Sequence, residues 1–96
     1  MRITFLSPAL EEITKAVEYY ESQAPGLGED LDRDIERTLG FLSHNPDLGS
    51  PFESQTRRAL LRRFPFGLVY RVAKDRIVLI ALIHLRREPG YWKDRV

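Results

Sequence analysis

The chain has 96 residues, of which 43% are hydrophobic and 30% charged, a net charge of +1 and no cysteine. This composition is typical of one ordinary globular domain, and we expect residues 1–96 to form a single domain. The lack of cysteine excludes disulfides and thiolate metal sites. With no recognisable signal peptide, we expect a cytoplasmic protein. The longest apolar run, 77–83, is too short to span a bilayer, so no membrane is expected as a partner.

The N-terminal half predicts one short strand and two helices. Residues 3–6 have a strand-like composition, and Ser7-Pro8 signals a helix start, because proline in the first turn gives up only an N–H that lacks a partner there. Apolar residues then recur at three- and four-residue steps until Pro25-Gly26. A second apolar stripe runs from Leu27 to Leu42, and Asn45-Pro46 closes it. We therefore expect two antiparallel helices joined by a tight turn.

The period changes from helical to alternating after a loop. Residues 45–56 contain two prolines, a glycine and several small polar side chains, which predicts a loop. Arg58–Phe64 and Leu68–Val72 then alternate as two strands, separated by a turn at residues 65–67. This part of the sequence therefore predicts a β-hairpin.

The last predicted strand is Arg76–His84. Every residue from Ile77 to Ile83 is apolar, which indicates that both faces of this strand are covered and that it lies inside the sheet. The predicted fold is α+β, in the order β-α-α-β-β-β, with a helical hairpin packed on one face of a small, mostly antiparallel sheet.

Charge is sorted by sign along the sequence. Residues 1–53 carry eleven acidic and four basic side chains, a net of −7, whereas residues 54–96 carry three acidic and eleven basic ones, a net of +8. Nine of those eleven bases are arginine, whose planar fork matches phosphate and carboxylate oxygens. This asymmetry favours an anionic partner, although a solvated basic sheet edge would have the same composition.

The segment after the last strand holds the residues best suited to chemistry. His84, Arg86, Arg87, Tyr91 and Trp92 fall within nine residues. Such a cluster could bind a phosphate, stack on a base and move a proton near neutral pH. Each member also has a structural explanation, since a strand-end histidine is often hydrogen-bonded at the surface and the two aromatic rings could cap the core.

Four arginines bracket the first strand of the hairpin. Arg58 and Arg62 share one face of the expected strand, and Arg57 and Arg63 share the other. One pair is therefore expected to face a groove beside His84, while the other pair stays solvated.

Common cofactor and catalytic motifs are absent from the sequence. His44 and His84 are far apart, and neither has further ligands at metal-binding spacing. There is no glycine-rich phosphate loop, no Ser-His-Asp order and no paired-carboxylate signature. We therefore expect no metal and no cofactor.

Four segments carry a resemblance to a known family. They are SPALEEI (7–13), NPDLG (45–49), RRFPFGLVYRV (62–72) and HLRREPGYW (84–92). Together they resemble the RelE/ParE toxin superfamily of type II toxin–antitoxin systems, of the plasmid-stabilisation type, over nearly the whole chain. The resemblance implies the fold predicted above and a toxin that a small cognate antitoxin neutralises by wrapping its basic groove with an acidic and apolar segment.

Two activities are known in that superfamily: cleavage of messenger RNA in the ribosomal A site, and poisoning of DNA gyrase. The RelE-type nucleases use hairpin bases, to which Arg58 and Arg62 correspond loosely, and carry an arginine before the Leu-Val-Tyr run, where this chain has Gly67. The pattern is more similar to the ParE branch, in which no hydrolytic site is expected. The residues that would form a RelE-type catalytic set are Arg62, His84, Arg87 and Tyr91.

The leading interpretation is a ParE-like toxin that inhibits an essential machine, with DNA gyrase favoured. The alternatives are a ribosome-dependent mRNA endoribonuclease of the RelE type and a non-toxic module that only binds an antitoxin. The expected partners are a cognate antitoxin and either gyrase or ribosome-bound mRNA. Sequence-specific DNA binding by this chain alone is not expected, because neither helix is basic. The binding residues expected to gather at one concave site, turned away from the acidic helices, are Arg58, Arg62, Arg63, Arg86, Arg87, Tyr91 and Trp92.

Overall fold

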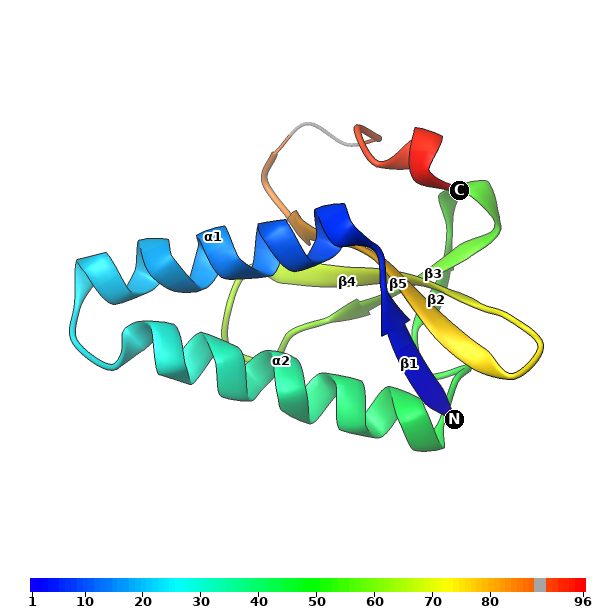
Figure 1. The fold of residues 1–96 in the computed structure, drawn as a ribbon, viewed down its shortest axis with the longest axis horizontal. Coiled ribbons are helices and arrows are strands. Elements are labelled where there is room, and N and C mark those ends of the chain that lie inside the picture. Colours follow the sequence, from blue (N-terminus) through cyan, green and yellow to red (C-terminus); the bar gives the residue numbers. More distant parts are fainter. Residues whose placement is uncertain (88–89) are drawn as a thin grey trace.

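The computed structural model describes residues 1–87 and 90–96, and its helices and strands form two layers (Figure 1). Glu88 and Pro89, which belong to the segment 84–92 that carries part of the family resemblance, lie outside the described residues. Along the chain the elements are β1 (Arg2–Phe5), α1 (Ser7–Gln23), α2 (Leu27–His44), β2 (Ser50–Phe52), the 3-10 helix η1 (Glu53–Gln55), β3 (Thr56–Leu60), β4 (Phe66–Val72), β5 (Arg76–His84) and the 3-10 helix η2 (Lys93–Arg95).

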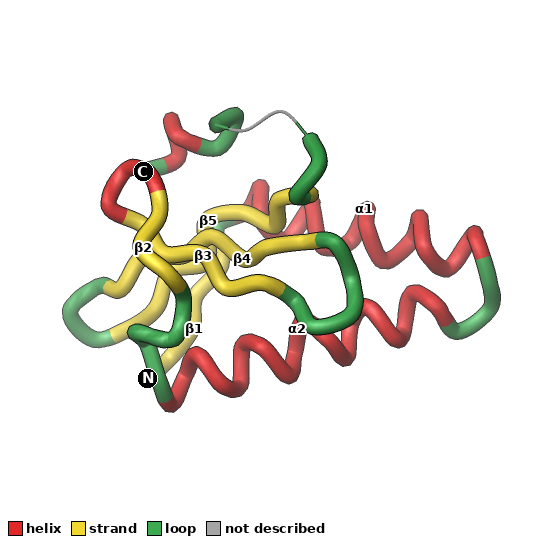
Figure 2. Tube along the Cα trace, turned by 180° about the vertical axis from the view of Figure 1, so that it is seen from behind, coloured by secondary structure: helices red, strands yellow, loops and turns green. Residues whose placement is uncertain are grey.

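The five strands form one sheet in the order β1-β5-β4-β3-β2. β1 pairs with β5 in parallel, and every other pair is antiparallel. Figure 2 shows α1 and α2 running side by side along one side of this sheet. The predicted α+β fold with a helical hairpin on a mostly antiparallel sheet is therefore confirmed. None of the helices in the described residues is long and apolar enough to cross a membrane.

The turn between the helices depends on close backbone contacts. Gly26 has φ of +86°, a left-handed conformation that suits glycine. The Glu21 carboxylate accepts hydrogen bonds from the backbone N–H groups of Gly26 (3.0 Å) and Gly28 (3.1 Å). A Cβ at Gly28 would lie 2.5 Å from the carbonyl oxygen of Val17, so only glycine lets the two helices approach this closely.

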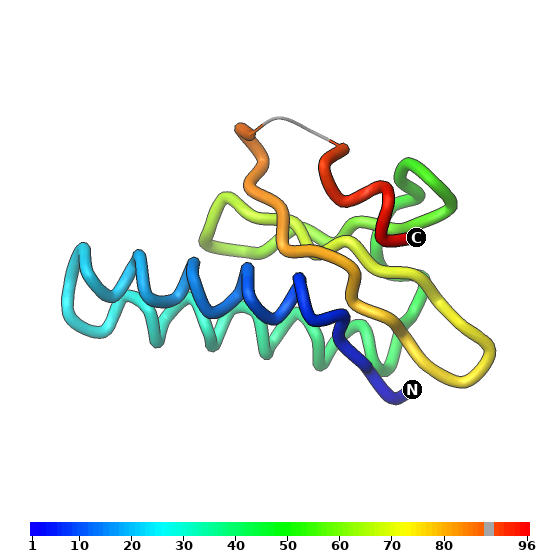
Figure 3. Tube along the Cα trace, turned by 45° about the horizontal axis from the view of Figure 1, so that its top comes forward, coloured from blue at the N-terminus to red at the C-terminus, as the bar shows by residue number. Residues whose placement is uncertain are grey.

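β5 is the inner strand that the sequence predicts, with the same bounds. All residues from Ile77 to Ile83 are buried. On one face the sheet packs against the helices, and on the other a smaller core forms around Ile80 and Trp92, with Phe52 against it. Figure 3 shows the red C-terminal end beside the green segment around β2. The C-terminal segment thus covers the face that the helices leave open.

Several strand boundaries differ from the prediction: β1 covers Arg2–Phe5 instead of 3–6, β3 begins at Thr56 instead of Arg58, and β4 begins at Phe66, inside the turn expected at 65–67. Ser50–Phe52 forms a short edge strand inside the expected loop, and β3 ends at Leu60 instead of continuing to Phe64. The backbone N–H groups of Arg62 and Arg63 donate to the carboxylate of Asp34 on α2, at 3.2 and 2.8 Å. Because these donors bind a helix side chain, the chain leaves the sheet and Arg62 lies in a turn.

Candidate binding groove

A groove with a volume of about 1120 Å³ lies between α1 and the end of β5. Lys15 and Tyr19 of α1 line one side, and His84, Arg87 and Tyr91 line the other. The groove therefore brings together His84, Arg87 and Tyr91, three of the residues that the sequence analysis selects. All three lie at or shortly after the end of β5, where this strand leaves the core.

The groove exists because β1 covers only the first part of β5. Their pairing ends at Phe5 and Leu79, after which the chain turns into α1. In the described part of the chain, no strand pairs with the remaining edge of β5. Its backbone groups bind side chains instead: Leu82 donates to Glu12 (3.2 Å) and accepts from the Tyr91 hydroxyl (3.2 Å), and Ile80 accepts from Arg95 (3.1 Å).

Arg95 and Glu12 tie the C-terminal segment to α1. The guanidinium donates to both carboxylate oxygens, at 3.0 and 3.1 Å, in a largely buried pair. This bond raises the pKa of Arg95. Arg95 also lies 5.4 Å from the centroid of the Tyr91 ring. The pair therefore holds Tyr91 against the sheet edge.

The Tyr91 phenol is a hydrogen-bond donor in this arrangement. Burial, followed by the nearby Glu12 carboxylate, raises its pKa to about 12. At neutral pH the phenol is protonated and its hydrogen points to the Leu82 carbonyl oxygen. Tyr91 is thus poorly placed to accept a proton from a substrate.

Aromatic rings form an apolar wall along the groove. Tyr20 contacts Tyr19 edge-on at 5.3 Å between ring centroids and Phe66 at 6.1 Å, and Phe66 contacts the His84 ring at 5.2 Å. His84 Nδ1 accepts a hydrogen bond from the backbone N–H of Arg86 at 3.1 Å. The neutral ring then carries its proton on Nε2, which can only donate. The wall offers apolar contacts flanked by hydrogen-bond donors.

Arg58 and Trp92 lie on the opposite face of the sheet from the helices. The Arg58 guanidinium lies 4.6 Å from the centroid of the Phe52 ring, and Phe52 stacks on Trp92 at 5.6 Å. Trp92 is 0% exposed. Trp92 therefore completes the second core, which is the alternative in which the aromatic rings cap the core. It is not available for contact with a partner in this structure. Arg86 is exposed and does not line the groove.

Arg62 and Arg63 lie on the other side of the helical hairpin from the groove. They line a separate hollow of about 310 Å³ between α2 and the β3–β4 turn, which we name the arginine cleft. Its lining residues are Asp30, Arg33, Asp34, Arg37, Arg62 and Arg63.

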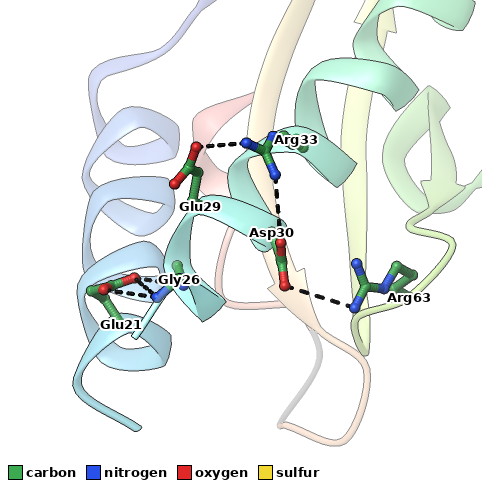
Figure 4. A network of polar contacts seen from close by, with 7 residues as sticks. Glu21, Gly26, Glu29, Asp30, Arg33 and Arg63 are labelled. Atoms are coloured by element: carbon green, nitrogen blue, oxygen red, sulfur yellow. Dashed lines mark hydrogen bonds and ion pairs between the residues drawn. The ribbon is translucent and has the colours of Figure 1, made fainter. Parts of the chain in front are cut away.

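The expected single concave site is therefore not observed. The predicted residues are divided among the groove, the opposite face of the sheet and the arginine cleft. Arg63 also lies 3.8 Å from Asp30 of α2, so it faces the acidic helix instead of turning away from it (Figure 4). The physical reason is the early end of β3, which carries Arg62 and Arg63 out of the sheet and towards α2.

Asp34 is a buried charged residue that the sequence reasoning missed. It is 3% exposed, accepts the N–H groups of Arg62 and Arg63, and pairs with Arg37. Burial alone would raise the pKa of Asp34, but these hydrogen bonds outweigh it and lower the pKa. The sequence does hold a signal for it, because Asp34 lies three residues after Leu31 and beside Ile35, on the apolar face of α2. In the residues that the structure describes, no group of three or more side chains could hold a metal ion.

Comparison with known proteins agrees with this architecture. Solved structures with the same fold include a chromosomal ParDE toxin–antitoxin system from P. aeruginosa, with a TM-score of 0.79, 21% identity and coverage of 90% of this chain and 97% of that one. Another is the toxin–antitoxin complex RelBE2 from Mycobacterium tuberculosis, with a TM-score of 0.59, 22% identity and coverage of 86% and 95%. A search of curated proteins found no match.

A match between the sequence and a protein-family model shows the family of the chain. The model described as ParE toxin of type II toxin–antitoxin system, parDE, matches residues 3–89, which include both helices and, except for Arg2 of β1, all five strands. The chain therefore belongs to the ParE toxin family of type II toxin–antitoxin systems.

Proposed function

We propose that this ParE-family toxin acts by binding an essential machine, DNA gyrase, without cleaving RNA, and that a cognate antitoxin neutralises it by occupying the groove between α1 and β5. The choice of target rests on one observation: this chain has glycine at position 67, where the RelE-type nucleases have an arginine.

Gly67 lies beneath the side chain of Arg58. A Cβ at position 67 would be 3.0 Å from Cγ and 3.1 Å from Cδ of Arg58, so a side chain at this position would crowd Arg58. The Arg58 guanidinium extends from there over the Phe52 ring. A phosphate-stabilising side chain is missing at this point, and Arg58 fills the space above it.

The other members of a nuclease set are also poorly arranged for proton transfer. The Tyr91 hydroxyl donates a hydrogen bond to the Leu82 carbonyl oxygen, and His84 Nδ1 accepts one from the backbone N–H of Arg86. Arg62 lines the arginine cleft instead of the groove. General acid–base catalysis needs groups within hydrogen-bond reach of one reacting centre. This dispersal supports a binding function over a hydrolytic one.

The groove suits the segment expected of an antitoxin. Its wall of Tyr19, Tyr20 and Phe66 offers apolar surface, and Lys15 and Arg87 offer positive charge. An extended segment with apolar and acidic side chains would match both. The two structural neighbours described above are a ParDE system and a RelBE2 complex, in which the related toxin is named together with an antitoxin.

Two reactions on the purified protein test the target. The protein is added to a gyrase supercoiling reaction and to a translating extract whose mRNA is then mapped for new ends. We expect gyrase-linked DNA breaks and intact mRNA. Arg87→Ala should reduce the breaks, whereas Arg71→Ala, which removes the same charge from an exposed position on β4, should not. New mRNA ends that disappear with His84→Ala would overturn the proposal in favour of a nuclease.

Antitoxin binding needs its own readout, because it can hold even if the target is different. The antitoxin encoded next to the toxin gene would be titrated against the wild type and against Tyr19→Ala. Weaker binding by the variant is expected if the groove is the site. Unchanged binding by Tyr19→Ala and by Arg87→Ala would place the antitoxin elsewhere. Activity in neither reaction, with tight antitoxin binding, would leave a non-toxic binding module.

A further inference from the structure

The arginine cleft is not used by the function proposed above. It lies against α2 and the β3–β4 turn, whereas the groove lies against α1 and β5. Its guanidiniums come from two elements: Arg33 and Arg37 are one turn apart on α2, and Arg62 and Arg63 are adjacent in the turn. Two separate elements therefore bring four arginines around one hollow of about 310 Å³.

One of the two carboxylates in the cleft, that of Asp34, is already bound by hydrogen-bond donors of the protein. Asp34 is buried and accepts from two backbone N–H groups as well as from Arg37. These bonds hold the β3–β4 turn against α2. They therefore fix where the backbone of Arg62 and Arg63 lies relative to the helix. Asp34 therefore builds the cleft and leaves little negative charge facing it.

The second carboxylate, Asp30, is held only loosely. It bridges Arg33 at 3.7 Å and Arg63 at 3.8 Å, distances longer than a hydrogen bond, and its side chain is 35% exposed (Figure 4). Arg33 has a closer partner at the rim, Glu29, at 2.6 Å. Among the residues that the structure describes, the Arg62 guanidinium has no ion pair. Asp30 thus acts as a weak internal counter-ion.

Positive charge exceeds negative charge in the cleft. Four guanidiniums face Asp30 and Asp34, and even with Glu29 counted at the rim they outnumber the carboxylates by four to three. We propose that the arginine cleft is an anion site that takes a phosphate group, supplied by a nucleic-acid strand or by a free polyphosphate. Asp30 occupies part of this site until the phosphate displaces it from Arg33 and Arg63.

Phosphate fits this arrangement better than a carboxylate does. Its oxygens point in tetrahedral directions and can accept from forks on several sides, while a carboxylate presents two oxygens in one plane. Arg33 and Arg37 approach from the helix, and Arg62 and Arg63 from the turn. Binding through the backbone phosphate is independent of base sequence, which agrees with the lack of a basic recognition helix.

Four variants test the site by fluorescence anisotropy with a fluorescein-labelled single-stranded oligodeoxynucleotide. Arg62→Ala should weaken binding roughly threefold to tenfold, because it removes a charged donor but keeps the backbone N–H that binds Asp34. Arg63→Ala should act similarly. Asp30→Asn should tighten binding, because it removes the internal counter-ion with little change in shape. Arg71→Ala, which has the same charge change as Arg62→Ala, should bind like the wild type. Circular dichroism confirms that each variant is folded.

Salt and small anions separate the two sources of phosphate. If a strand binds, the dependence of log affinity on log salt should flatten by about 0.7 for each phosphate contact that Arg62→Ala removes. If free polyphosphate is the ligand, inorganic pyrophosphate should bind by calorimetry with the same response to Arg62→Ala and Asp30→Asn, and the strand should not bind.

Three results would overturn the proposal. One is that neither the strand nor pyrophosphate binds the wild type. The second is an equal loss with Arg62→Ala and Arg71→Ala, which would mean a diffuse charge effect. The third is a glutamate-rich peptide that binds more tightly than either phosphate probe and loses affinity with Arg62→Ala. None of these results bears on the groove, so the test is independent of the gyrase and antitoxin experiments.

Discussion

The groove and the arginine cleft lie on opposite sides of the helical hairpin and are held in place by different physics. The groove depends on the C-terminal segment, which the buried Trp92 ring and the largely buried Arg95–Glu12 ion pair hold against the rest of the protein. The cleft depends on one buried carboxylate that fixes a turn. Mutations in one region should therefore leave the other intact, and this independence can be tested.

The largest expected effect is that of Trp92→Ala, which removes the side chain that closes the second core. A fully buried aromatic ring replaced by alanine costs about 3–5 kcal/mol of folding stability. Urea unfolding followed by far-UV circular dichroism measures the change. Trp92→Phe, which keeps an aromatic ring against Phe52, should lose clearly less. A small effect of Trp92→Ala would mean that the C-terminal segment is not held as the structure shows.

Asp34→Ala should have the next largest effect and should act on the cleft. It leaves two backbone N–H groups and the Arg37 guanidinium without their acceptor, which should cost about 2–4 kcal/mol. Hydrogen exchange should increase at the Arg62 and Arg63 amides while that of β5 changes less. Equal acceleration throughout the chain, in a variant that is still folded, would show that the two regions are not independent.

The sequence predicts those parts of the molecule that depend on local periodicity. The apolar stripes of α1 and α2 and the continuous apolar run of β5 need only neighbouring residues, and their bounds agree closely with the structure. β2 escapes notice because three residues with a proline carry almost no periodic signal. Arg62 is misplaced because the partner that bends its turn, Asp34, is 28 residues away.

The candidate site divides in the same way. His84, Arg87 and Tyr91 come together because they all follow one strand end, a relation that is visible in the sequence. The position of Trp92 is set by Phe52, forty residues earlier, on an edge strand that the sequence does not predict. Arg58 is drawn to that same ring. Long-range partners therefore decide which arginines and aromatics remain free for binding.

Acid should weaken the cleft through Asp34. The pKa of Asp34 is lower in the folded chain than in the unfolded one, so the folded state binds fewer protons there. Its contribution to stability is complete above the ordinary carboxyl pKa, near pH 4, and is lost as the pH falls through the lower folded value. The free energy of unfolding, measured between neutral pH and about pH 2, should fall less steeply for Asp34→Asn than for the wild type. Parallel curves would contradict this role of Asp34.

The smallest expected effect is that of Tyr91→Phe, and it tests the chemistry of the groove. The change removes only the hydroxyl that donates to Leu82, so the loss of stability should be about 0.5–1.5 kcal/mol. With a pKa of about 12, the phenol is protonated throughout the physiological range and serves as a structural donor. If gyrase is the target, as proposed above, the variant should therefore inhibit it like the wild type, with the same pH profile. Loss of toxic activity together with unchanged urea unfolding would instead mean that the hydroxyl leaves Leu82 to act on a substrate.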